Sequence, residues 1–267
     1  MDLKNYIFSP GEKPLDHMVT NGGFTGIFRT IACIGDSLSS GELESFELGH
    51  KGYHDYFEYS WGQFIARDAG CKVYNFSRGG MSTRAYMEGF AEEKGFFDIE
   101  LRAQAYIMAL GVNDTTFILS KELELGTIED INPKNYTQNK PTFAGYYGAI
   151  ISKYKEIQPH AKFFLMTMPR DGADAERNAI YDQMSELIRA IAKLFSNCFV
   201  LDFRKYAPDY DETFKKNFFL GGHLNVQGYR LTALMVESYI DYLIRAYPEE
   251  FKQCGYIGKP FYNGENL

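Results

Sequence analysis

Short apolar runs alternate with longer segments of helical spacing along most of this chain, and this alternation is its strongest constraint on folding. The apolar runs lie at residues 30–35, 71–77, 103–111, 161–169 and 198–203. The segments with helical spacing lie at residues 60–70, 81–93, 142–159, 175–197 and 225–247. Strands that alternate with helices of this length form parallel sheets with right-handed crossovers. The pattern predicts the α/β class, as a three-layer α/β/α sandwich on a flavodoxin-like, doubly wound parallel sheet of about five strands.

The domain organisation follows from length and from the absence of breaks. A chain of 267 residues can bury a sizeable core as one domain. No repeat, low-complexity tract or linker divides it, so we expect a single domain over residues 1–267, with extensions at residues 1–29 and 246–267. Three long connections, at residues 43–59, 115–140 and 204–220, are predicted to be loops that serve function or bind a partner.

Composition excludes several classes of protein. The formal net charge is -7, and an acidic surface argues against nucleic acid or an anionic membrane as the main partner. No run approaches the ~18 apolar residues of a membrane span, and residues 1–20 do not have the pattern of a secretion signal. The cysteines match no zinc or CxxC spacing, which favours free thiols in a reducing compartment; they are Cys33, Cys71, Cys198 and Cys254. We therefore expect a cytoplasmic protein.

Residues that could take part in catalysis follow four of the predicted strands. Ser37 comes after the first strand, Gly79 and Gly80 after the second, Asn113 after the third, and His223 after the fifth and its loop. Open α/β sheets bind ligands beyond the carboxyl ends of their strands, so we expect these residues at one edge. A hydroxyl, backbone N–H groups, a carboxamide and an imidazole are the parts of an acyl-transfer site. Taken singly, the same residues are equally typical of a helix N-cap, a tight turn, an Asx turn and a structural histidine.

Together the four sets resemble the motif blocks of the GDSL family of esterases, also called SGNH hydrolases. "IGDSLS" at residues 34–39 resembles the first block, "NFSRGG" at 75–80 the second, "GVND" at 111–114 the third and "HLNVQGY" at 223–229 the last. One short motif recurs by chance, but four in order, each after a predicted strand, are specific. The resemblance covers about residues 31–229. It implies the SGNH hydrolase fold and a serine hydrolase that cleaves esters through an acyl-enzyme.

The resemblance also implies a role for each residue. Ser37 would be the nucleophile, and His223 the base that takes its proton and returns it to the leaving alcohol. Ser37, Gly80 and Asn113 would form the oxyanion hole, where one donor typically contributes ~3 kcal/mol of transition-state stabilisation. Gly80 would allow close approach because it has no Cβ, although Gly79 beside it is an alternative. Asp114 is predicted to hold its loop by local hydrogen bonds instead of taking part in the chemistry.

One position departs from the family pattern. The last block usually reads Asp-x-x-His, with the aspartate orienting the imidazole, but Leu220 stands three residues before His223. A backbone carbonyl, such as that of Leu220, could hold the imidazole and leave a Ser–His dyad. Asp202, Asp209 or Asp211 could substitute, or efficient catalysis could be lost. We favour the dyad, because Ser37, Gly80, Asn113 and His223 are all retained.

The predicted substrate is a small, acetyl-like acyl ester of a carbohydrate or other polar alcohol. Aromatic residues such as Phe46, Tyr53 and Tyr56 lie in the first long connection, where they could stack on a sugar ring. Many members of the resembling family deacetylate carbohydrates. Arg170, after the fourth strand, is a candidate substrate-binding residue for an anionic group, although a solvated loop residue is the more common role.

Two other functions remain open at this point. An acyltransferase would use the same residues, and a catalytically weakened ligand-binding protein would be consistent with Leu220. No cofactor is expected, because the mechanism requires neither a metal nor a nucleotide. His50 and His54 have metal-ligand spacing, but nearby glycines weaken a helix there and no third ligand is evident. No feature of the sequence indicates an oligomeric state.

Overall fold

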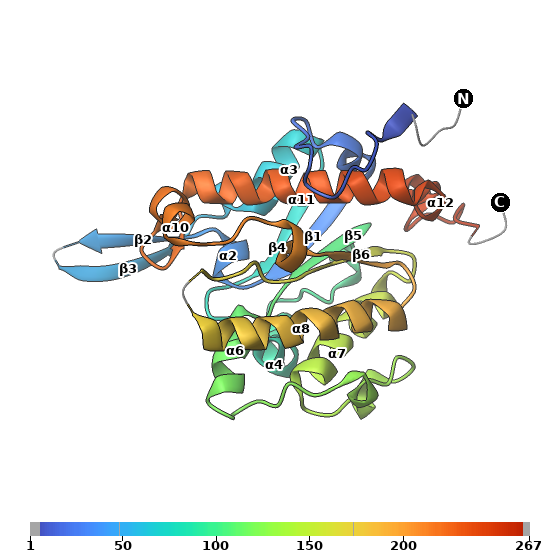
Figure 1. Ribbon diagram of the computed structural model, residues 1–267. Helices are drawn as coiled ribbons and strands as arrows, with labels where there is room; N and C mark the ends of the chain where they lie inside the picture. The colour runs from blue at the N-terminus through green and yellow to red at the C-terminus, as the bar shows by residue number, and fades with distance from the viewer. Residues whose placement is uncertain (1–5, 48, 173, 264–267) are drawn as a thin grey trace.

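A parallel five-stranded sheet forms the centre of the protein (Figure 1). The computed structural model describes residues 6–47, 49–172 and 174–263. The strands are β1 (Thr30–Gly35), β4 (Lys72–Ser77), β5 (Ala105–Ala109), β6 (Lys162–Met166) and β7 (Cys198–Leu201), in the spatial order β4-β1-β5-β6-β7. The chain moves outward from β1 to one side and then to the other, which is the doubly wound order. The predicted fold class is therefore confirmed.

Helices cover both faces of the sheet and give the three layers (Figure 1). One face packs against α3 (Trp61–Ala69) and α11 (Val226–Ala246), and the other against α7 (Phe143–Ile157) and α8 (Ala175–Leu194). Each helix begins with a side-chain cap, from Ser60, Asn225, Thr142 and Asp174 respectively. The helix predicted over residues 81–93 is built from α4 (Thr83–Ala85), a π-helical turn (Tyr86–Phe90) and α5 (Ala91–Glu93).

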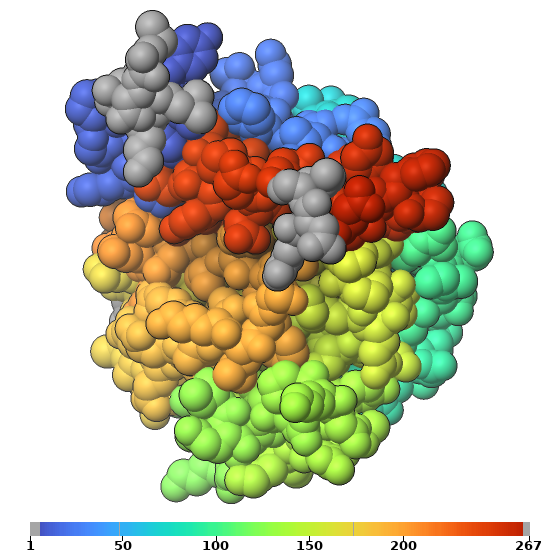
Figure 2. All heavy atoms as spheres, turned by 90° about the vertical axis from the view of Figure 1, so that its right-hand side faces the viewer, coloured from blue at the N-terminus to red at the C-terminus, as the bar shows by residue number. Residues whose placement is uncertain are grey.

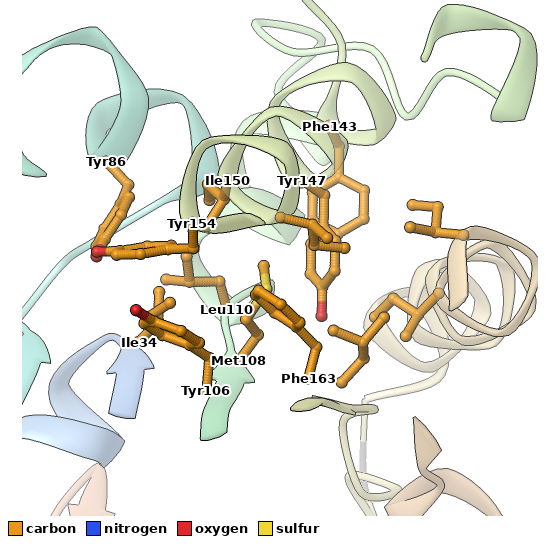
Figure 3. Close-up of a cluster of buried hydrophobic side chains, with 14 of the residues drawn as sticks. Ile34, Tyr86, Tyr106, Met108, Leu110, Phe143, Tyr147, Ile150, Tyr154 and Phe163 are labelled. Atoms are coloured by element: carbon orange, nitrogen blue, oxygen red, sulfur yellow. The ribbon is translucent and has the colours of Figure 1, made fainter. Parts of the chain in front are cut away.

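Aromatic side chains fill the layer between the sheet and α7 (Figure 3). The hydroxyl groups of Tyr86 and Tyr154 form a hydrogen bond of 2.6 Å, which satisfies both groups in the interior. The ring of Tyr106 stacks on that of Phe163, with 5.1 Å between centroids. This rigid layer supports the strand ends from which the candidate site is built.

The long connections contain regular structure, contrary to the loops predicted there. Residues 43–59 fall mostly in a hairpin of β2 (Glu42–Glu47) and β3 (His50–Asp55), which projects from one end of the molecule (Figure 1). Its strands are polar and largely exposed, so they lack the alternation of apolar and polar residues by which a strand can be recognised in a sequence.

The other two connections also contain helices or strands. Residues 115–140 begin inside α6 (Val112–Leu119) and include two 3-10 turns (Ile128–Asp130 and Tyr136–Gln138). Residues 204–220 include parts of α9 (Phe203–Tyr206) and all of α10 (Glu212–Phe218) and β8 (Phe219–Leu220), which pairs with β9 (His223–Leu224).

The terminal segments lie at the opposite end of the molecule from the hairpin (Figure 1), and Figure 2 views the end on which they lie. The N-terminal segment packs on α11, where Glu12 forms an ion pair with Arg245 at 2.7 Å. The C-terminal segment contains α12 (Pro248–Phe251) and a 3-10 turn (Cys254–Tyr256), and Phe251 packs on Phe199 of β7. Over the described residues, these two segments pack away from the carboxyl ends of the strands.

The cysteines are free, and none of the helices in the described ranges is long and apolar enough to cross a bilayer. Cys33 and Cys254 are buried, whereas Cys71 and Cys198 are half-buried. The expectation of free thiols is confirmed.

Glu237 of α11 gives the fold a pH-dependent stability. It is completely buried, and this burial, together with the charge of Asp68, raises the pKa of Glu237 to about 8. The folded state therefore holds the proton more tightly than the unfolded state, and the group's contribution to stability is lost as the pH rises from about 4.5 to about 8. We expect Glu237→Gln to raise the free energy of unfolding at pH 8.5 by on the order of 1–3 kcal/mol and to change it less at about pH 5.

Urea denaturation at the two pH values measures this difference. Glu92→Gln, at an exposed position of α5, serves as the matched control. Equal destabilisation of Glu237→Gln at both pH values would show that the carboxyl group is needed for packing and not penalised by its charge.

Candidate active site

The candidate nucleophile, Ser37, stands at the turn between β1 and the short helix α2 (Ser37–Ser40). Asp36, and not Ser37, is the N-cap, because its side chain accepts a hydrogen bond from the Leu38 N–H at 3.0 Å. A Cβ at Gly35 would collide with the Ser39 side chain, so only glycine lets the helix fold back this closely. As the first residue of α2, Ser37 also has a backbone N–H with no acceptor inside the helix.

His223 reaches Ser37 from β9, which pairs antiparallel with β8. The distance from its Nε2 to the Ser37 Oγ is 3.0 Å. The two residues are 186 positions apart in the sequence, and the sheet edge brings them together as expected. This distance is within the range for direct proton transfer between a hydroxyl group and a base.

The acid beside His223 is Glu44 of the β2–β3 hairpin. Its Oε1 lies 2.7 Å from His223 Nδ1, and the residue is 3% exposed. Leu220, by contrast, is 46% exposed. This corrects the Ser–His dyad that we favoured from the sequence, in which a backbone carbonyl holds the imidazole.

The other carboxylates considered from the sequence have different partners. Asp202 forms a bidentate ion pair with Arg189, Asp211 caps α10, and Asp209 is exposed. The sequence does not point to Glu44, because the family pattern places the acid three residues before His223, at Leu220. The one sequence feature that could have indicated Glu44 is the alternation of residues 42, 44 and 46 on one face of the hairpin, in a segment that we predicted to be a loop.

Three hydrogen bonds hold Glu44 in its ionised form. Burial alone would raise its pKa, but Lys51 at 2.7 Å, His223, and the Gly222 N–H at 2.9 Å outweigh this, so the pKa of Glu44 lies below its ordinary value. An ionised carboxylate only accepts hydrogen bonds, so Nδ1 of His223 must carry a proton. The neutral imidazole then presents a lone pair at Nε2, which is the state that a base needs.

A second carboxylate, Glu42, also contacts His223. Its Oε1 lies 3.0 Å from Nε2, the same nitrogen that contacts Ser37. Burial raises the pKa of Glu42, although the charge of His223 opposes the shift. A Cβ at Gly79 would collide with the Glu42 carboxylate, so glycine at this position makes room for it. The sequence had given no reason to consider Glu42.

Glu42 should contribute to the pH dependence of activity. Its carboxyl group lies 3.0 Å from Nε2 and its pKa is raised by burial, so Glu42 changes charge beside the candidate base as the pH falls. We expect Glu42→Gln to remove this contribution and to change the acid limb of the kcat/KM profile. The exposed Glu47→Gln, on the same strand, is the control. An unchanged acid limb in Glu42→Gln would contradict this role.

The remaining predicted residues lie on two neighbouring segments. Asn113 is in the first turn of α6, and its Nδ2 donates to the Met81 carbonyl at 3.0 Å, which leaves its second hydrogen available. Gly80 has a φ of 71°, and a Cβ there would meet nothing within 4 Å. The left-handed backbone therefore accounts for glycine at residue 80, and the close approach of a substrate oxygen stays a prediction. Its N–H, like that of Ser37, stays a predicted oxyanion donor.

Asp114 has a structural role, as predicted, but its hydrogen bonds reach a residue 31 positions away and are not local. It accepts hydrogen bonds from the Thr83 N–H at 3.0 Å and the Thr83 hydroxyl at 2.6 Å. Burial raises the pKa of Asp114 to about 6. These bonds join α6 to the first residue of α4, and so help to fix the positions of Asn113 and Gly80 relative to each other.

The other candidates lie outside this cluster. Arg170 follows β6 and lies exposed on the wall of a cavity next to the site. His54 pairs with the Ser45 hydroxyl at 2.7 Å. Over the residues that the structure describes, no group of three His, Cys, Asp or Glu side chains could hold a metal ion.

Several solved structures share this fold. They include the acetyl xylan esterase AlAXEase (18% identity, 79% of this chain and 99% of that chain covered, TM-score 0.53). Est24, a carbohydrate acetylesterase from Sinorhizobium meliloti, is similar at 16% identity over 80% of this chain and 99% of that chain, with a TM-score of 0.52. A family two carbohydrate esterase from Clostridium thermocellum, in complex with cellohexaose, matches at 14% identity over 87% and 66% of the respective chains, with a TM-score of 0.57. At these identities the similarity establishes the fold alone.

An ester-hydrolysing enzyme is the class that this fold and its sequence blocks define. Residues 33–231, more than half of the chain, match the GDSL-like Lipase/Acylhydrolase family. The chain belongs to that family, as its four blocks predicted. No curated protein matches the sequence.

Proposed function

We propose that this protein is a serine esterase that hydrolyses a small, acetyl-like acyl ester of a carbohydrate or another polar alcohol. The observation that carries the proposal is the continuous chain from Glu44 through His223 to Ser37, with distances of 2.7 Å and 3.0 Å. A buried acid, an imidazole and a hydroxyl in this order form a Ser–His–acid triad. Leu220 was the reason to consider a binding protein without catalysis, and the contact of Glu44 with His223 argues against that alternative.

The proposed mechanism has two halves, formation and hydrolysis of an acyl-enzyme, and the same residues act in both. Ser37 Oγ attacks the ester carbonyl carbon while His223 Nε2 takes its proton, and Glu44 stabilises the resulting imidazolium. The oxyanion accepts hydrogen bonds from the backbone N–H groups of Ser37 and Gly80 and from the Asn113 side chain. The carbon–oxygen bond to the alcohol then breaks, and His223 protonates the leaving oxygen. Water, deprotonated by His223, attacks the acyl-enzyme, and the carboxylic acid leaves as Ser37 regains its proton.

The hairpin supports a carbohydrate or similarly polar alcohol as the leaving group. The ring of Tyr53 packs edge-on against the His223 imidazole, with 5.8 Å between centroids, yet Tyr53 is 55% exposed. Phe46 is exposed on the same hairpin. Exposed aromatic rings next to a catalytic centre favour a ligand with a ring face to stack against. The carbohydrate esterases among the structural neighbours are consistent with this choice.

A panel of esters tests the proposal. We expect kcat/KM to be highest for p-nitrophenyl acetate and to fall with acyl length, and we expect acetate release from an acetylated xylooligosaccharide. Transfer of acetyl to an added alcohol in place of water would identify an acyltransferase instead. The absence of hydrolysis of every ester, or equal rates for wild type and Ser37→Ala, would contradict the proposal.

A further inference from the structure

A cavity of about 300 Å³ lies beside the proposed triad. Three of its lining residues are the sequence neighbours of site residues: Leu38 follows Ser37, Val112 precedes Asn113, and Gly222 precedes His223. The cavity therefore adjoins the nucleophile, on the side of the β6 carboxyl end. Its volume is at the lower end of the range for small-molecule sites.

The charges of this cavity are opposite to those of the whole chain. Arg170, Arg177 and Lys215 line it with a single carboxylate, Asp171, whereas the chain has a net charge of -7. Lys215 is neutralised by Asp171, because their charged atoms are 2.7 Å apart. Asp174 partly neutralises Arg177, so the excess of positive charge comes chiefly from Arg170.

The two arginines differ in how they are held. The nearest charged atoms of Arg177 and Asp174 are 3.6 Å apart, and the Arg177 guanidinium also reaches the Val112 carbonyl at 3.4 Å. Arg170 forms no direct ion pair with any residue in the described ranges, although its charge acts on Asp182, and its side chain is exposed. An anion in the cavity can therefore contact the two guanidinium groups without first breaking a strong ion pair.

The hairpin that carries Glu44 is acidic. Glu42 and Asp55 lie on the hairpin face that carries Glu44, and Lys51 neutralises only Glu44. An anionic group on a substrate would be repelled from the hairpin and attracted to the arginines. The apolar walls contributed by Met168 and Pro169 reduce screening by water and strengthen this preference.

We propose that this cavity is an anion subsite, in which Arg170 and Arg177 bind a carboxylate or phosphate group of the substrate. The inference rests on the proposed function and narrows its substrate class to acyl esters of acidic polar alcohols, such as a uronic acid or a sugar phosphate. Guanidinium groups suit both anions, because each offers paired oxygens to their parallel N–H donors.

Calorimetric titration with three sugars tests the subsite without any turnover. D-glucuronate, D-glucose 6-phosphate and D-glucose share a ring and differ in the group at the sixth carbon. At least one of the two anions should bind about tenfold more tightly than glucose, and should inhibit hydrolysis of p-nitrophenyl acetate competitively. Arg170→Gln and Arg177→Gln should each weaken its binding about five- to tenfold. Lys193→Gln, at an exposed position of α8 outside the cavity lining, should leave it unchanged.

Equal binding of the three sugars, or no binding of any, would overturn the subsite, as would an anion preference that survives both arginine substitutions. Which of the two anions binds more tightly separates the carboxylate from the phosphate. An active esterase without an anion preference would refute the subsite alone. Anion binding by a protein that hydrolyses no ester would refute the proposed function alone.

Discussion

Replacing Glu44 with glutamine should lower kcat about 10³- to 10⁴-fold. Glutamine keeps the size of the side chain but cannot stabilise the imidazolium, and it can donate a hydrogen bond to His223 Nδ1 and so favour the wrong tautomer. The effect should be large because Glu44 is buried and forms the 2.7 Å contact with Nδ1. Steady-state kinetics with p-nitrophenyl acetate measure it, and thermal unfolding shows whether the variant is folded.

The matched controls are the carboxylates that the sequence had suggested. Asp209→Asn changes an exposed residue and should alter kcat by less than about twofold. Asp202→Asn removes the negative charge that pairs with Arg189, so it should affect stability more than rate. Asp211→Asn keeps a side-chain cap on α10, because asparagine caps about as well as aspartate, so it should change both only slightly. A loss of activity in any of these that equals the loss in Glu44→Gln, or an almost fully active Glu44→Gln, would refute the role of Glu44.

Ser37→Ala should have the largest effect, a loss of about 10⁵- to 10⁶-fold in kcat. No neighbouring hydroxyl can replace it, because the Ser39 and Ser40 side chains are buried and Ser40 donates to the Ser37 carbonyl. The substitution removes only an oxygen at the start of α2, where Asp36 provides the cap, so the fold should be retained. Ser39→Ala is the control, and its rate should stay within about tenfold of wild type.

A measurable residual rate in Ser37→Ala would come from the oxyanion donors and from binding alone. If the variant instead hydrolyses esters as fast as wild type, the reaction occurs elsewhere on the protein. Acetylated sugar substrates should give the same ranking of variants as p-nitrophenyl acetate, because both pass through the same acyl-enzyme.

The central sheet was predictable because its strands are buried on both faces. A continuous apolar run such as residues 103–111 marks a strand by composition alone, and β5 lies within it. The hairpin was not predictable in the same way. Its strands are polar and mostly exposed or half-buried, and the buried Glu44 bonds to Gly222 and His223, which come much later in the chain, so no pattern of burial marks the hairpin.

Within the candidate site, only the residues that come directly after strands of the central sheet were predictable from the sequence. Ser37 and Asn113 come directly after strands, so the topology of the sheet places them at one edge. Glu44 follows no strand of the sheet and is 179 residues from His223 in the sequence, so no spacing rule connects the two. The family pattern directed attention to Leu220, three residues from the histidine, whereas the acid comes from a hairpin between the first and second blocks.

The central claim is that Ser37 is a nucleophile activated by the His223–Glu44 pair. Labelling with a fluorophosphonate, followed by intact mass and peptide mapping, tests it most directly. We predict a single adduct on Ser37 in wild type and a labelling rate at least about 100-fold slower in Glu44→Gln. An adduct on another residue, no adduct at all, or equal labelling rates in the two proteins would contradict the account.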